Sequence, residues 1–199
     1  WIAAFCHNQN ELGDEVPAKP ASMAFYRALE SCSGCVCCVD ESGWYFDRVW
    51  CEYESYLVLT EAKSEICMYT ALAHQYTAPI TGAKETRMAV GLCSGFAKDS
   101  SDPTVAETWE IKLAREAAFP RYLLEMGIGE RSIEGAEAGR EKDKNRILNL
   151  LCNVEGKKLR GEPPSSDHPA YKHANELLQG YLASMILPSV LLSSDVVFR

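Results

Sequence analysis

Long apolar runs and nucleotide-binding motifs are missing from this sequence of 199 residues. A transmembrane helix needs about 20 consecutive apolar residues. The nearest approach, Tyr181 to Phe198, is interrupted by Pro188, several serines and Asp195, so we expect no membrane span. The chain also has no Gly-x-Gly-x-x-Gly, P-loop or His-Glu-x-x-His motif, which leaves it without the usual signatures of dinucleotide, phosphate or zinc-protease sites.

Basic residues are also in short supply. Lys and Arg number 20 against 28 Asp and Glu, which gives a formal net charge of −8. A nucleic-acid surface needs clustered positive charge. The only basic cluster, Lys157, Lys158 and Arg160, is short and falls in an expected linker. We therefore expect no nucleic-acid partner.

Cysteine, by contrast, is abundant, with nine residues, of which Cys32, Cys35, Cys37 and Cys38 crowd together. The Cys32-x-x-Cys35 spacing is typical of a zinc knuckle or a redox pair. A closed zinc site needs four ligands, and no separate second pair of this spacing exists. On a strand, Cys35 and Cys37 would point to one face and Cys38 to the other. We expect buried, reduced thiols and no metal, with a redox pair or a metal site as alternatives.

The order of expected elements indicates an α/β fold, because strands and helices alternate in the first half of the chain. Both faces of the predicted strand at Gly34–Val39 are apolar, which is typical of a central parallel strand. Asp47 is the expected N-cap of the helix that begins at Arg48. The predicted elements are a strand at Trp1–Phe5, a helix at Ala21–Ser31, a strand at Gly34–Val39, a helix from Arg48 to Thr60 and a strand at Glu65–Thr70.

The second half is expected to be mostly helical. Residues 71–102 read as loops around one short element near Met88–Cys93. Thr104 and Glu107 form a capping box that begins a helix, which should end near Pro120. A further helix is predicted from Glu141 to Cys152. We expect domain boundaries at 1–155, a linker at 156–169 and a helical extension at 170–199, whose helix runs from Pro169 until Pro188 stops it.

The expected C-terminal helix is strongly amphipathic, and one face carries large apolar side chains at helical spacing. Such a face needs a partner surface, so we predict that it docks onto another protein. Its residues are Leu178, Tyr181, Leu182, Met185 and Ile186.

The stretch that begins the Arg48–Thr60 helix is the best candidate for chemistry. Trp50 and Glu54 lie four residues apart and therefore on one helical face. An aromatic wall beside a carboxylate suits a cationic or oxocarbenium-like species. The simpler alternative is that Trp50 belongs to the core while Glu54 is solvated.

The segment from Phe25 to Leu57 resembles the middle of a TIR domain, in which a hydrophobic strand and a loop precede a Trp-Cys-x-x-Glu helix. The Arg48-x-Trp50-Cys51-x-x-Glu54 motif and the opening Trp1 to Gln9 are similar to a divergent TIR-like group abundant in alveolate algae such as dinoflagellates. The resemblance implies a flavodoxin-like parallel sheet flanked by helices over residues 1–155. It also implies that the chain lacks the first strand of that fold.

The resemblance implies two activities. Many TIR domains are pure interaction modules, and we expect a TIR-like scaffold of this kind, with protein partners and no cofactor, in the cytoplasm or another reducing compartment. In enzymatic TIR domains the glutamate that matches Glu54 cleaves the nicotinamide–ribose bond of NAD, so the alternative is an NAD glycohydrolase with Glu54 as the catalytic residue and Trp50 and Arg48 at the substrate.

A third alternative is an accessory structural subunit of a larger assembly, held by the amphipathic extension. The sequence has no initiator Met. If a targeting sequence was removed, the assembly would be organellar, in a plastid for example, and could be photosynthetic.

Overall fold

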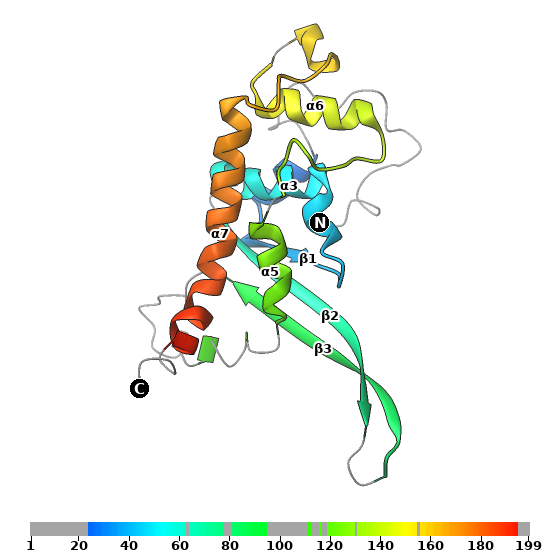
Figure 1. Ribbon diagram of the computed structural model, residues 1–199. Coiled ribbons are helices and arrows are strands. Elements are labelled where there is room, and N and C mark those ends of the chain that lie inside the picture. Colours follow the sequence, from blue (N-terminus) through cyan, green and yellow to red (C-terminus); the bar gives the residue numbers. More distant parts are fainter. Residues whose placement is uncertain are drawn as a thin grey trace. The chain divides into compact units, whose positions relative to one another are not determined.

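The structure is a computed structural model that describes residues 24–62, 64–77, 81–94, 111–112, 116, 119–129, 131–154 and 156–194 (Figure 1). The chain divides into two compact units, and each is described by itself. Unit 1 comprises residues 1–35, 47–65 and 132–177, and unit 2 comprises residues 36–46, 66–131 and 178–199. The predicted strand at Trp1–Phe5 and the capping box at Thr104 and Glu107 lie outside the described residues.

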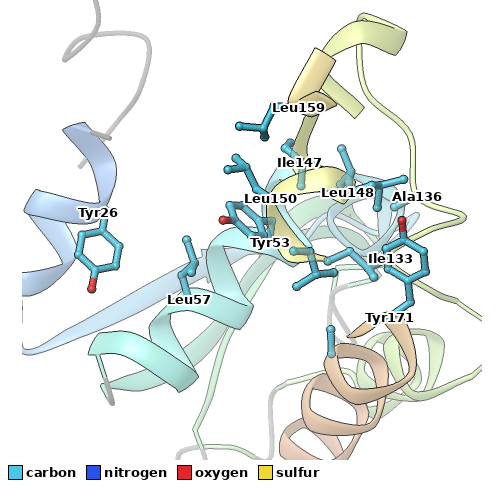
Figure 2. Close-up of a cluster of buried hydrophobic side chains, with 13 residues drawn as sticks. Tyr26, Tyr53, Leu57, Ile133, Ala136, Ile147, Leu148, Leu150, Leu159 and Tyr171 are labelled. Carbon is cyan, nitrogen blue, oxygen red and sulfur yellow. The ribbon is translucent and has the colours of Figure 1, made fainter. Parts of the chain in front are cut away.

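Unit 1 is built from helices around one hydrophobic core. It contains α2 (Ala24–Glu30), α3 (Val49–Leu57), α6 (Glu141–Leu151) and the first part of α7 (Pro169–Ser194). Figure 2 shows side chains of α3 and α6 meeting beside the ring of Tyr171 from α7. The helices at Glu141–Cys152 and Ala21–Ser31 are thereby confirmed within a few residues. The core residues are Tyr26, Val49, Tyr53, Leu57, Ile133, Ala136, Ile147, Leu148, Leu150, Leu151, Leu159, Tyr171 and Ala174.

Helix α3 forms because its apolar residues recur at helical spacing. Val49, Tyr53 and Leu57 are four residues apart, and all three are buried in the core of unit 1. The predicted cap at Asp47 is wrong. The N-cap position is Arg48, in extended conformation with no side-chain cap, because the backbone around Glu137 pairs with this residue and fixes where the helix begins.

Unit 2 contains a mixed sheet, so the chain has an α/β fold. The strands are β1 (Gly34–Cys38), β2 (Glu65–Thr77) and β3 (Lys84–Ser94), in the order β1-β2-β3. Gly34 lies beside Glu65, and Val39 donates to the Tyr69 carbonyl at 2.8 Å. Strands β1 and β2 therefore run in the same direction, with α3 between them in sequence, whereas β2 and β3 pair in antiparallel orientation.

The β2–β3 hairpin corrects the prediction of loops at residues 71–77 and 84–87, while the short element predicted near Met88–Cys93 is part of β3. The loops predicted at residues 78–80 and 95–102 lie outside the described residues. Strand β2 continues to Thr77, and eleven residue pairs join it to β3, from Cys67↔Ser94 to Thr77↔Lys84. Gly82, at φ +67°, supplies the left-handed conformation that the connection requires. The strands are long because each supplies the other's backbone hydrogen bonds, a condition that local composition does not reveal.

Strand β1 is confirmed, but the prediction of two buried faces is wrong. Among the described strands it lies at one end of the order, and within it only Cys37 is buried. Val36 and Cys38 are exposed on the opposite face. An apolar run is compatible with two-sided burial, yet burial also needs a second covering layer.

Helices of unit 2 cover one face of the sheet. Helix α5 (Arg121–Ile128) packs closely on α7, since a Cβ at Gly127 would come within 2.6 Å of Leu182. The Tyr181 hydroxyl accepts from the backbone N–H of Ile66 and donates to its carbonyl, both at 3.0 Å, which fixes α7 to the beginning of β2. The buried side chains of this layer include Phe46, Ile66, Met68, Cys93, Leu123, Leu124, Leu178, Leu182, Met185 and Ile186.

Pro120 has a role that was not predicted, and the prediction for Pro188 is wrong. Pro120 is the N-cap of α5, so it also opens a helix that the sequence did not indicate. A proline is tolerated there because the first turn has no intrahelical partner for its nitrogen. Pro188 was predicted to stop α7, but the helix continues to Ser194. Proline removes one hydrogen bond of a helix, and the buried Met185 and Ile186 hold the preceding turn in place.

The expected linker and extension do not form separate segments. Residues 156–160 form a short 3₁₀ turn, and Leu159 within it is part of the core of unit 1. Helix α7 belongs to unit 1 up to Leu177 and to unit 2 from Leu178. The C-terminal helix therefore completes both cores, which differs from an extension that begins at residue 170.

A buried ion pair closes one end of β3. Lys112 is fully buried, and its ammonium group binds the carboxylate of Glu116 and donates to the Ser94 carbonyl at 3.0 Å. The same carboxylate accepts from the Ser94 N–H at 2.8 Å. Each charged group is thus matched by a partner, which is the condition for burying charge without a large penalty.

The same substitution at two glycines should have opposite effects on stability. A Cβ at Gly91 would lie 2.6 Å from the Phe119 backbone, so Gly91→Ala should lower the free energy of unfolding by about 1–3 kcal/mol. Gly180 lies in α7 with nothing within 4 Å of that position, so Gly180→Ala should raise it by about 0.5–1 kcal/mol. Urea unfolding of both variants measures this, and equal shifts would contradict the packing of β3 on Phe119.

Candidate functional site

The motif residues occupy the first two turns of α3, in unit 1. Their position is fixed at the start of the helix, where the Val49 N–H donates to the Glu137 carbonyl at 2.9 Å. The Glu137 N–H in turn donates to the Asp47 carbonyl at 2.6 Å. This short parallel bridge fixes the direction of α3 and therefore the positions of Arg48, Trp50 and Glu54.

Trp50 is a half-buried residue that packs against the core of unit 1. This placement favours the simpler sequence interpretation for the indole, in which it contributes to packing. Arg48 is exposed at the N-cap, where its charge acts on Glu54. The structure thus brings the three predicted site residues onto one end of one helix, and they differ in how far water reaches them.

Glu54 is half-buried, which contradicts the alternative of a fully solvated carboxylate. Burial disfavours the charged form and raises the pKa of Glu54 to about 7, while the positive charge of Arg48 acts in the opposite direction. A carboxyl group with this pKa is present in both protonation states near neutral pH. That is the property required of a general acid or base.

Cys51 precedes this carboxyl group by three residues but has different chemistry. Burial, reinforced by the negative charge of Glu54, raises the pKa of the Cys51 thiol to about 11. The thiolate is the nucleophilic form of cysteine, so at neutral pH this thiol is protonated and unreactive. In this motif the titratable group that can work near neutral pH is therefore Glu54.

The predicted interaction face of α7 is turned into the molecule. Leu178, Leu182, Met185 and Ile186 are buried in unit 2, and Tyr181 is half-buried with its hydroxyl bonded to β2. The amphipathic pattern does identify a buried helix face, but the surface that covers it belongs to the same chain.

An exposed apolar surface lies on the sheet of unit 2, on the face opposite the buried side chains Met68 and Cys93. We call it the open face. Its large residues are well exposed, with Val36 at 60%, Met88 at 57% and Val90 at 52%. The open face comprises Val36, Cys38, Ala71, Ala73, Met88 and Val90.

Sequence reasoning missed the open face because it missed the hairpin. A signal was present: residues 65–77 and 84–94 are two runs of similar length on either side of Gly82. Alternation along these runs would have placed Ala71 and Ala73 on one face and Thr70 on the other. Which face is buried depends on helices distant in sequence, so the pattern alone does not identify the exposed one.

The cysteine cluster is only partly buried. Cys37 is buried and Cys35 is partly buried, whereas Cys32 and Cys38 are exposed, so the prediction of buried thiols is wrong for those two. The predicted alternation is confirmed, since Cys37 and Cys38 face opposite sides of β1. Within the described ranges, no group of three or more His, Cys, Asp or Glu side chains is placed to hold a metal ion.

Two further observations concern the chain as a whole. In the part of the chain that the structure describes, none of the helices has both the length and the apolar character needed to cross a bilayer. Comparisons with protein-family models, with curated proteins and with solved structures find no match to this chain.

Protonation of Glu54 should make stability depend on pH. Because the pKa of Glu54 rises from 4.5 when unfolded to about 7 when folded, the folded state binds more protons between these values. The free energy of unfolding should therefore fall as the pH rises from about 5 to about 8, by on the order of 1–3 kcal/mol relative to Glu54→Gln.

Urea unfolding at several pH values measures this difference. The matched control is Glu41→Gln, which alters an exposed carboxylate on a turn and should retain the wild-type pH profile. Parallel profiles for the wild type and Glu54→Gln would show that Glu54 ionises in the folded state as it does in water.

Proposed function

We propose that this chain is a TIR-like protein-interaction module that binds a partner protein through the open face. The observation that carries the proposal is the exposure of Val36, Met88 and Val90 on one side of the sheet. Isolated apolar side chains on a surface are common, but several on one contiguous face are typical of an interaction site.

The chemistry of the open face supports this proposal. Its six residues include no Asp, Glu, Lys, Arg or His, in a chain whose net charge is −8. Depletion of charge at the centre of a surface patch distinguishes the core of an interface from ordinary surface. Lys84 and Thr86 follow on the same side of β3 toward the hairpin turn, and they provide a polar border.

We also propose that the α/β fold is flavodoxin-like. A flavodoxin-like arrangement is supported by the βαβ order of β1, α3 and β2, with parallel strands and the Trp-Cys-x-x-Glu motif on the connecting helix. The antiparallel hairpin is a departure from an all-parallel sheet. We interpret it as the element that adapts the fold to binding.

The exposed thiol of Cys38 can report whether the open face is covered. In the cells that make this protein, alkylation of Cys38 should be several-fold slower than in the dilute purified chain, because a bound partner restricts access. Cys32 is the matched control, since it is exposed but lies outside the open face. Peptide mass spectrometry measures both sites. The purified chain is diluted until it is monomeric, and equal rates at Cys38 in cells and in this monomer would contradict the proposal.

A second candidate function is supported by one specific observation, the half-buried Glu54 carboxyl with a pKa near 7. We propose as the alternative an NAD glycohydrolase in which ionised Glu54 stabilises the oxocarbenium-like ribose as the nicotinamide–ribose bond breaks. Nicotinamide leaves with the bonding electrons, and a water molecule bonds to the ribose carbon and releases its proton to solvent. Arg48 and Trp50, on the same end of α3, would contact the substrate. Here the chain would act on NAD as a substrate and would hold no resident cofactor.

Nicotinamide release from NAD tests the alternative. Glu54→Gln should lower the rate at least about 100-fold, because the amide cannot supply the negative charge. The rate of the wild type should rise through about pH 7, as the pKa of Glu54 requires when the ionised form is active. Glu61→Gln, at an exposed position just after α3, should retain the wild-type rate. Release that does not depend on Glu54 would exclude this function.

A further inference from the structure

On the part of the open face formed by β2 and β3, one strand carries small side chains and the other carries large ones. Ala71 on β2 is directly opposite Val90 on β3, and Ala73 is directly opposite Met88. All four side chains are exposed on one side of the sheet. Over these two pairs the larger side chains of β3 form a ridge and the smaller side chains of β2 form a groove beside it. The groove ends at the next pair on this face, Tyr69 and Leu92, whose side chains are both large.

A ridge and a groove side by side are complementary to a second copy of the same surface. A two-fold axis parallel to the strands, and running between β2 and β3, would place β3 of each copy over β2 of the other. This rotation does not change the position of a residue along the strand direction. Val90 would therefore lie over Ala71 of the second copy, and Met88 over Ala73. Two sheets packed face to face in this way stand about 10 Å apart.

Charge does not oppose this association. The ridge and the groove contain no ionisable side chain, so two chains of net charge −8 can approach there without placing carboxylates against each other. Toward the hairpin turn, Lys84 is paired with Thr77. The same rotation would place Lys84 over Thr77 of the second copy, so the two ammonium groups would not face each other.

We infer that the occupant of the open face is a second copy of this chain, bound with Val90 and Met88 of each copy over Ala71 and Ala73 of the other. This inference rests on the proposed interaction function and names its partner. The interface is isologous, so each copy contributes the same surface. Val36 and Cys38 lie at its border, because β1 is on the far side of β2 from the axis.

Analytical ultracentrifugation of the purified chain tests the inference. The wild type should sediment as a dimer. Val90→Lys and Ala71→Glu should each be monomeric, since each would bury an unpaired charge at the interface. Both positions are exposed, so both variants should retain the circular dichroism spectrum of the wild type. Ala83→Lys, at an exposed position in the hairpin turn, should remain dimeric.

Mixing the two monomeric variants provides the decisive measurement. In a mixed dimer the introduced ammonium group at position 90 would lie over the introduced carboxylate at position 71, while the other contact would keep the wild-type pair Val90 and Ala71. An equimolar mixture should therefore recover a dimer, and more weakly so at high salt. Failure to recover a dimer would overturn the proposed two-fold arrangement, as would a wild-type dimer that neither substitution disrupts.

The outcome for the interaction function can be separated from this one. A purified wild type that remains monomeric would overturn the second copy as the occupant. If Cys38 were nevertheless protected in cells, the open face would bind a different protein, and the interaction function would stand. Unprotected Cys38 together with a monomeric chain would overturn both proposals.

Discussion

One row of residues across the three strands fixes the arrangement of unit 2. Thr70 and Gly91 are paired in register, Val39 follows the end of β1 beside Thr70, and all three residues are buried. The Thr70 hydroxyl donates to the Val39 carbonyl at 2.7 Å, so the polar atom of this fully buried side chain is satisfied. Gly91 leaves room for the Phe119 backbone. A shift of one residue would expose Thr70 and bury its neighbours.

This register determines which side chains of the sheet are exposed. With Thr70 and Met68 facing inward, Ala71 and Ala73 must face outward, because side chains alternate along a strand. The helices that cover the inward face use their apolar side chains there, including the α7 residues Leu182 and Met185. The apolar side chains that stay exposed on this sheet are therefore on its other face. The amphipathic helix that was expected to dock onto another protein is part of the core.

Patterns within about ten residues were enough to predict β1, α3 and α6, because periodicity and short-range spacing carry their signal. The hairpin could not be found in this way, since each strand depends on pairing with the other. The candidate site could likewise be predicted only in part. The spacing of Trp50 and Glu54 identified the candidate carboxyl, but its pKa depends on burial, and burial is set by residues from distant parts of the chain.

Both candidate sites depart from what stability alone would favour. An exposed apolar ridge lacks the stabilising free energy that burial would give, roughly 25 cal/mol for each Å² of apolar surface. A carboxyl group whose pKa lies well above its ordinary value lowers the stability of the folded state at neutral pH, and an amide of the same size at position 54 would not. Departures of this kind are concentrated at functional sites. The open face and Glu54 share no residue and lie in different units, so binding and catalysis are compatible roles for one chain.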